Sequence, residues 1–86
     1  MVQDMKAYVL ITTRAGMEEK VAAAIKKIKG AASADSVYGH YDVIVIVESP
    51  EMKTLNSIVH EIQKQEGVLH TETGFSQHVE DLSGRE

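Results

Sequence analysis

The sequence predicts an α+β sandwich whose elements follow in the order strand, helix, strand, strand, helix, strand. Three observations support this prediction. Two segments repeat apolar residues at helical spacing, and lysine and glycine residues end each pattern. The apolar run at residues 43–47 is too short for a helix and is rich in β-branched residues. The chain has 86 residues, which is enough for one small domain.

The first half of the chain predicts a strand, a helix and a second strand. Residues 7–12 are rich in β-forming side chains. Residues 17–29 have a helical apolar period, with glutamates in the first turn, lysines in the last, and Gly30 as the stop. Residues 32–38 form a less apolar strand. We expect it at the edge of a sheet, where serine and aspartate side chains are tolerated.

The second half predicts the most apolar strand, a helix and a last strand. Residues 42–48 carry valines on one face and isoleucines on the other, so both faces need cover. Ser49 is expected as the N-cap of the next helix, with Pro50 in its first position. That helix ends before Gly67, and residues 68–76 read as the fourth strand.

This order is the ferredoxin-like split βαβ arrangement, a four-stranded antiparallel sheet with two helices on one face. Right-handed crossovers place the first and third strands in the centre. The domain is expected to span residues 7–76, followed by a polar, partly disordered tail at 77–86. Two helices leave the other sheet face bare and apolar, so we predict a two-fold dimer through this open face or through the strand edges. The alternative is a monomer whose tail folds over the sheet.

The composition excludes several classes of protein. The net charge is −4, from 9 basic and 13 acidic side chains, which disfavours direct DNA binding. The absence of cysteine removes disulfides, thiol catalysis and zinc–cysteine sites. The start of the chain lacks a signal peptide, and no apolar stretch has the length of a membrane helix. The sequence therefore predicts a soluble, cytoplasmic protein.

Catalytic and metal-binding motifs are not found in the sequence. It contains no Ser-His-Asp order, glycine-rich phosphate loop or H-E-x-x-H pattern. His70 and Glu72 share one face of the predicted fourth strand, but a pair without a third ligand is weak evidence for a metal. We therefore expect no catalytic residue, no metal and no cofactor.

The segment at residues 38–42 carries more chemistry than a turn requires. If Tyr38 and Tyr41 flank a two-residue loop, Gly39 and His40 form it, and the glycine suits a type II′ turn. This turn does not explain Asp42, because aspartate is a poor strand former. An aspartate beside aromatic rings can hold an ammonium group, and amides near a glycine can hold a carboxylate. These groups suit a free amino acid, although turn chemistry alone explains half of the motif.

Two threonines of the last strand extend this hypothesis. Thr71 and Thr73 could supply hydroxyl groups to the same site from a neighbouring subunit. The alternative is that they are there because threonine favours strands.

The chain resembles the effector-binding (RAM) domain of the Lrp/AsnC family. The resemblance rests on the βαββαβ order, the G-x-Y-D motif at residues 39–42 and the H-T-E-T motif at residues 70–73. It covers roughly residues 7–76, and the G-x-Y-D hairpin is its most specific part. It implies dimers joined through their sheets, octamer-like rings of dimers, and a free amino acid bound between dimers. By motif, the ligand-binding residues are Gly39, His40, Tyr41, Asp42, Thr71 and Thr73.

The chain departs from this family in two ways. Family regulators carry an N-terminal helix-turn-helix domain, whereas only six residues precede the predicted first strand. The resemblance therefore implies a stand-alone form that does not bind DNA directly and modulates full-length Lrp/AsnC regulators. Gly74 and Phe75, followed by a longer polar tail, are the second departure.

Two other functions compete with amino-acid sensing. A small dimeric ferredoxin-like enzyme, such as a monooxygenase, needs a polar residue pointing between sheet and helices, and the predicted inward faces are apolar. An assembly module without a ligand would use residues 38–42 only as a contact between dimers.

Overall fold

The structure, a computed structural model, describes residues 3–79 and confirms the predicted order of elements. The expected tail lies outside these residues from position 80 onward. The elements are β1 (Gln3–Thr13), α1 (Glu18–Lys26), β2 (Ala31–Ser36), β3 (Val43–Ser49), α2 (Met52–Gln63) and β4 (Val68–Val79).

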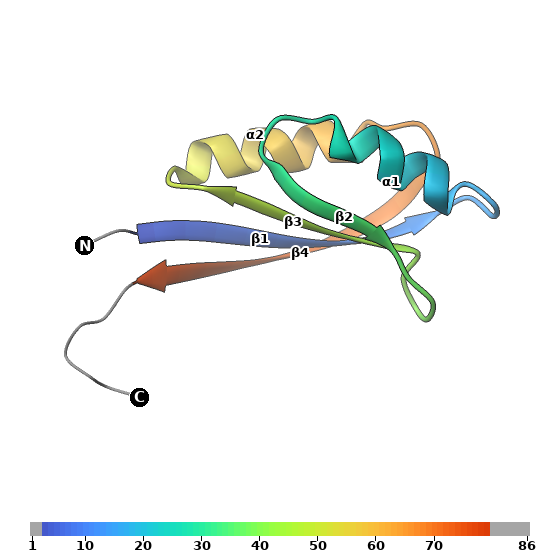
Figure 1. Cartoon of the computed structure of the whole chain (residues 1–86), viewed down its shortest axis with the longest axis horizontal. Helices are drawn as coiled ribbons and strands as arrows, with labels where there is room; N and C mark the ends of the chain where they lie inside the picture. Colours follow the sequence, from blue (N-terminus) through green and yellow to red (C-terminus); the bar gives the residue numbers. More distant parts are fainter. Residues whose placement is uncertain (1–2, 80–86) are drawn as a thin grey trace.

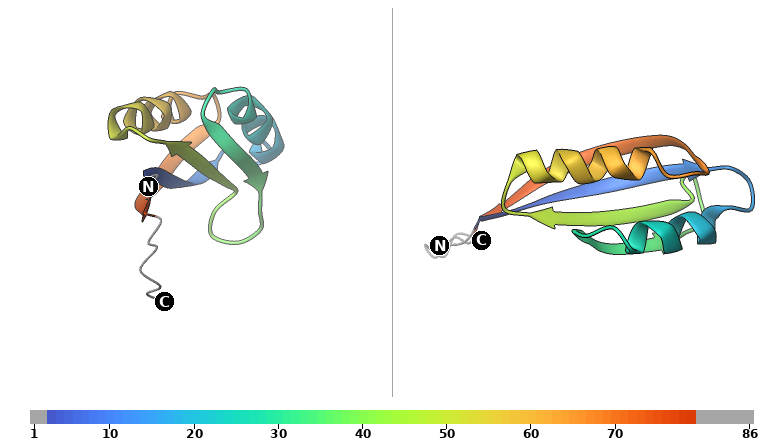
Figure 2. Two further views of the ribbon diagram at one scale, coloured as in Figure 1. Left: turned by 60° about the vertical axis from the view of Figure 1, so that its left-hand side comes forward. Right: turned by 90° about the horizontal axis from the view of Figure 1, so that it is seen from above.

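The four strands form one antiparallel sheet in the order β2-β3-β1-β4, with β1 and β3 in the centre as predicted. Both helices lie on the same side of the sheet (Figures 1 and 2). α1 packs mainly over β2, and α2 packs over β1, β3 and β4. Within residues 3–79, the opposite side of the sheet has no helical layer.

The core lies between the sheet and the helices. Strand residues alternate between the two faces of a sheet, so every second residue of β1 and β3 is buried beneath the helices. Nine large side chains are fully buried there: Val9, Ile11, Val21, Ile25, Val43, Val45, Val47, Leu55 and Ile62.

The open face carries the intervening residues. Tyr8 and Leu10 of β1 pair with Ile46 and Ile44 of β3, and all four side chains are partly accessible. At one end of this face, the Lys6 ammonium lies 3.7 Å from a carboxylate oxygen of Glu48. The open face therefore has an apolar centre and a charged margin.

β1 and β4 are longer than predicted, with β4 reaching Val79 instead of residue 76. β3 is shifted by one residue, which changes the start of α2. β1 begins at Gln3 rather than residue 7, and Met5 pairs with Ser49 at the end of β3. Ser49 is thus a strand residue, and the prediction that it is the N-cap of α2 is wrong. The N-cap is Glu51. The backbone N–H of Glu51 donates a hydrogen bond to the Ser49 hydroxyl at 3.2 Å.

The first helix is shorter than predicted. It ends at Lys26, and the chain then tightens through hydrogen bonds from Lys27 N–H to Ala24 and from Ile28 N–H to Ile25. Such i to i−3 bonds commonly close the last turn of a helix. Gly30 has a φ of +102°, and a Cβ there would clash with the Ile58 side chain.

The connection between β2 and β3 differs from the predicted two-residue turn. The Val37 N–H donates to the Asp42 carbonyl at 2.9 Å, which closes a longer loop at residues 38–41. Gly39 has a φ of +136°, so the loop does need glycine there. The loop projects from the sheet on the side away from the helices (Figures 1 and 2).

Candidate ligand site

Asp42 forms two hydrogen bonds that link the start of β3 to the end of β1. Its backbone N–H donates to the Ile11 carbonyl at 2.8 Å, and its carboxylate accepts the Thr13 N–H at 2.8 Å. Thr13 is buried, with 6% of its surface exposed, so its N–H needs a partner within the protein. The aspartate that is unfavourable in a strand therefore serves the fold by completing the β1–β3 pairing.

Tyr41 turns onto the open face and contacts β4. Its hydroxyl donates a 2.5 Å hydrogen bond to a carboxylate oxygen of Glu72. Glu72 lies opposite Leu10 in the sheet register, which places it on the face without helices. The exposed His40 ring lies beside the Tyr41 ring, tilted by 58° with centroids 6.5 Å apart.

The hydrogen bond to Glu72 raises the pKa of Tyr41 above its usual value of 10.0, and desolvation and the negative charge of Glu72 act in the same direction. The phenol must lose its proton to titrate, and the contact favours the neutral form. The contact therefore stabilises the fold below pH about 10, and this stabilisation is lost as the pH rises through the folded-state pKa.

We expect Glu72→Ala to bring the pKa of Tyr41 back toward that of a free tyrosine. The measurement is the ultraviolet absorbance of tyrosinate against pH, with the Tyr41→Phe variant subtracted to isolate Tyr41. An unchanged Tyr41 titration in Glu72→Ala would show that the two side chains do not interact in solution.

Two of the predicted ligand residues share a cavity at the hairpin. Gly39 and Asp42 line a space of about 190 Å³ between the loop and the start of α1. Glu18 and Glu19, the first two residues of α1, line the opposite wall. Ser36, Val37 and Tyr38 complete the lining. Three of the lining residues are acidic, and their negative charges favour a cationic group over an anionic one.

The two threonines do not lie at this cavity within one chain. Thr71 pairs with Ile11 and Thr73 with Val9, so both lie on the helix-covered face. The Thr71 hydroxyl accepts a hydrogen bond from the Gln63 side-chain amide at 3.2 Å. Their predicted role, which requires a neighbouring subunit, remains a prediction.

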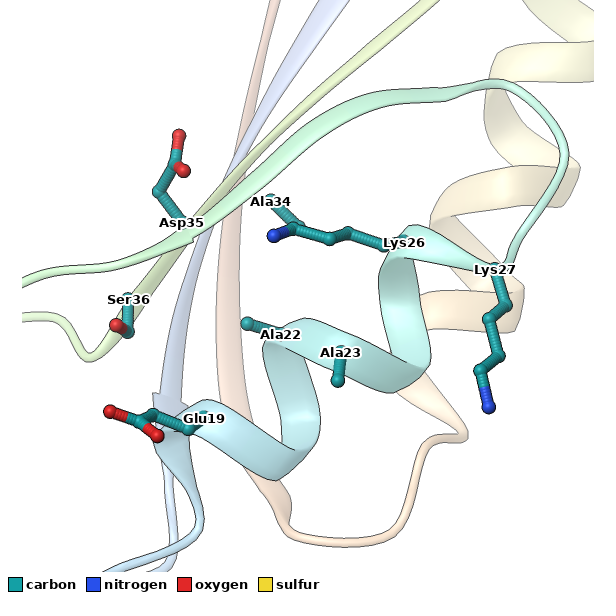
Figure 3. Close-up of a pocket in the computed structure, with 8 residues that line it drawn as sticks. All are labelled: Glu19, Ala22, Ala23, Lys26, Lys27, Ala34, Asp35 and Ser36. Atoms are coloured by element: carbon teal, nitrogen blue, oxygen red, sulfur yellow. The ribbon is translucent and has the colours of Figure 1, made fainter.

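A larger cavity lies elsewhere and contains none of the ligand residues expected at the loop or on the last strand. It is an open groove of about 570 Å³ between α1 and β2. Its lining includes three alanines, Ala22, Ala23 and Ala34, whose short side chains leave the groove hollow (Figure 3). Lys26 extends across it from α1, whereas Lys27 points away (Figure 3). The groove results from small side chains and shows no converging hydrogen-bonding groups, so we place the candidate site at the hairpin.

The other candidate chemistry is limited. His70 and Glu72 share the open face as expected, because they pair with Thr12 and Leu10. Among residues 3–79 no group of three or more histidine, aspartate or glutamate side chains is placed to hold a metal ion. Neither helix in that range has the length and apolar character to cross a membrane.

Sequence reasoning missed three contributors to this region. Glu18 and Glu19 reach the hairpin because of how α1 packs over β2, which local patterns do not reveal. Thr13 contributes its backbone N–H, which donates to the Asp42 carboxylate, and a residue type does not indicate such a backbone contact. An available signal was Asp42 itself, since a carboxylate that opens a central strand needs a partner.

The single helical layer and the β2-β3-β1-β4 sheet define a ferredoxin-like α+β domain. The family model of the Lrp/AsnC ligand binding domain matches residues 6–81. The chain therefore belongs to this family. A comparison with curated proteins produced no match.

Solved structures with the same fold include proteins of similar length. The hypothetical protein PHS023 from Pyrococcus horikoshii is 30% identical with a TM-score of 0.80, and the match covers 95% of this chain and 99% of that one. FFRP-DM1 is 33% identical with a TM-score of 0.77, covering 84% and 97%. The regulator NMB0573 from Neisseria meningitidis, solved as a complex with L-Met, shares the fold at 17% identity and a TM-score of 0.72. The match covers 92% of this chain but only 52% of that regulator.

Proposed function

We propose that this protein is a regulatory module that binds a free amino acid at the β2–β3 hairpin and is not an enzyme. The observation that carries the proposal is the hairpin cavity, where Gly39 and Asp42 meet Glu18 and Glu19. Membership of the ligand-binding family and the L-Met complex of NMB0573 support an amino acid as the ligand class.

The charges of the cavity favour one orientation of the ligand. The α-ammonium group would lie toward Asp42 and the glutamates of α1, because carboxylates stabilise a nearby cation. The α-carboxylate would then point out of the cavity, toward donors of an adjoining subunit. The hydroxyls of Thr71 and Thr73 are the donors that we assign to this role.

We also propose that the subunits pair through their open sheet faces and that these dimers assemble into an octamer-like ring. Tyr8, Leu10, Ile44 and Ile46 form an apolar centre that a monomer leaves partly in water. Contiguous apolar patches of this kind usually mark interfaces. Ring assembly would bring hairpins of different dimers together and complete the site with partner threonines.

The decisive experiment is a thermal-shift screen of the standard amino acids, with L-methionine included. A ligand at 100 times its Kd stabilises the native state by about 2.7 kcal/mol. For a domain of this size that corresponds to a rise in Tm of about 10 °C or more. No shift with any amino acid would contradict the proposal.

A matched pair of ligands tests the orientation. N-acetyl-L-methionine keeps the carboxylate and the side chain of L-methionine but lacks its ammonium group. If L-methionine raises the Tm, the acetylated form should not, because its neutral amide gains nothing from the three carboxylates. Equal shifts for both compounds would place the ammonium group outside the cavity.

One observation supports a second candidate function, in which the protein is an assembly module without a ligand. The Asp42 carboxylate already accepts the Thr13 N–H, so the hairpin has a structural use in the absence of any amino acid. Under this alternative, amino acids change neither the Tm nor the size of the oligomer.

The enzyme alternative has less support. In the described part of the chain, the buried core between sheet and helices consists of apolar side chains, and the buried polar residues are Thr13 and Ser49. Both take part in hydrogen bonds within the fold. We propose instead that the protein acts in the cytoplasm by tuning full-length Lrp/AsnC regulators, without contacting DNA itself.

A further inference from the structure

The hairpin loop is exposed, yet its last residue, Tyr41, and the adjoining Asp42 form hydrogen bonds to two different strands. Tyr38, Gly39 and His40 are all exposed, and a Cβ at Gly39 would meet nothing within 4 Å. The Asp42 carboxylate accepts a hydrogen bond from the Thr13 N–H of β1, whereas the Tyr41 hydroxyl donates one to Glu72 of β4. The conformation of the loop therefore depends on two side-chain contacts rather than on packing.

The contact between Tyr41 and Glu72 spans the sheet. Tyr41 immediately precedes Asp42 and β3, and β1 lies between β3 and β4 in the sheet order. The Tyr41 side chain must therefore reach across the end of β1 to meet Glu72, which is 31 residues away in the sequence. This contact sets where the loop lies over the open face, in addition to the anchor that Asp42 provides.

Glu72 does not line the hairpin cavity. Within one subunit Glu72 therefore has no direct contact with the cavity, and it can change the shape of the cavity only through another group. Its hydrogen bond with Tyr41 can transmit such an effect. Tyr41 lies in the chain between the two cavity residues Gly39 and Asp42.

We propose that Glu72 is a positioning residue of the amino-acid site, which holds the hairpin in its binding conformation through the Tyr41 hydroxyl. This inference rests on the function proposed above. A protein that binds only in one conformation has an apparent Kd equal to the intrinsic Kd divided by the fraction in that conformation. Loss of the contact would lower this fraction and weaken binding, although neither Tyr41 nor Glu72 lines the cavity.

The test compares four variants by calorimetric titration with each amino acid that shifts the wild-type Tm. Glu72→Ala and Tyr41→Phe should each weaken binding about five-fold, which matches a competent fraction that falls to about one fifth. Glu72→Gln keeps an acceptor oxygen for the Tyr41 hydroxyl, so it should recover most of the affinity. The double variant Tyr41→Phe/Glu72→Ala should be no weaker than either single variant, because both break the same contact.

Two controls separate positioning from general damage to the protein. Glu48→Ala removes a carboxylate of the same open face at its other end, where it pairs with Lys6, and should leave affinity unchanged. Amide hydrogen exchange should be faster at residues 38–41 in Glu72→Ala and unchanged in the core strands.

Three results would overturn the inference. Wild-type affinity in Glu72→Ala would show that the contact does not position the site. Additive losses in the double variant would show that Glu72 acts independently of Tyr41. If the wild-type protein binds no amino acid, the proposed function fails and this inference fails with it, a result distinct from the first two because they require wild-type binding.

Discussion

Gly74→Arg is expected to convert the proposed dimer into monomers. Gly74 lies opposite Tyr8 on the open face, and a Cβ at this position would meet nothing within 4 Å. The monomer can therefore accept the new side chain, but a dimer would have to bury a guanidinium group without a partner. Such uncompensated charges cost about 3–5 kcal/mol, which raises the dissociation constant of the dimer at least a hundred-fold. Sedimentation velocity over a range of concentrations measures this change.

The adjacent residue provides a matched control. Phe75 lies opposite Ala7 on the helix-covered side of β4, with 47% of its surface exposed. Phe75→Arg adds the same charge one position away but on the other face, so the dimer should persist. Dissociation by Phe75→Arg and not by Gly74→Arg would assign the interface to the opposite side of the sheet.

Asp42→Ala is expected to lower the free energy of unfolding by about 1–3 kcal/mol, the usual cost of leaving a buried polar group without its partner. The affected group is the Thr13 N–H, which the Asp42 carboxylate now accepts at 2.8 Å. Urea denaturation at a fixed protein concentration measures the loss. A change below about 0.5 kcal/mol would show that water replaces the carboxylate at Thr13, as at an ordinary exposed site.

Asp42→Asn separates the structural role from the ligand role. The amide oxygen of asparagine can still accept the Thr13 N–H, so stability should remain close to that of the wild-type protein. The negative charge is lost, and we expect amino-acid binding to weaken about ten-fold, since hydrogen bonds to a charged group contribute more than neutral ones. Unchanged affinity in Asp42→Asn would indicate that Asp42 serves the fold alone.

The topology was predictable because it depends on periodic patterns. The alternation of valine and isoleucine in β3 places one set beneath the helices and the other on the open face, as the structure confirms. Strand ends were less predictable, because pairing decides them. Met5 and Ser49 extend β1 and β3 by pairing with each other, and neither residue type signals this alone.

The candidate site was predictable only in part, for a physical reason. Asp42 was identified because aspartate is a poor strand former, and Gly39 because it belongs to the same G-x-Y-D motif; the two residues do share a cavity. The partner of Asp42 is a backbone amide, and the partner of Tyr41 is a glutamate on a distant strand. Such contacts arise from tertiary packing, which a pattern within one segment does not contain.

The pairing of β1 with β4 determines where an attached domain would lie. Gln3 pairs with Val79, so both ends of the described chain meet at one end of the sheet, whereas the hairpin adjoins the other end of β1. At about 3.4 Å per residue, the eleven residues of β1 hold these two places roughly 34 Å apart. A domain joined at either end would therefore start at the opposite end of the sheet from an amino acid at the hairpin of its own subunit. We expect such a domain to respond to how the subunits are arranged, so that the geometry of the assembly carries the signal.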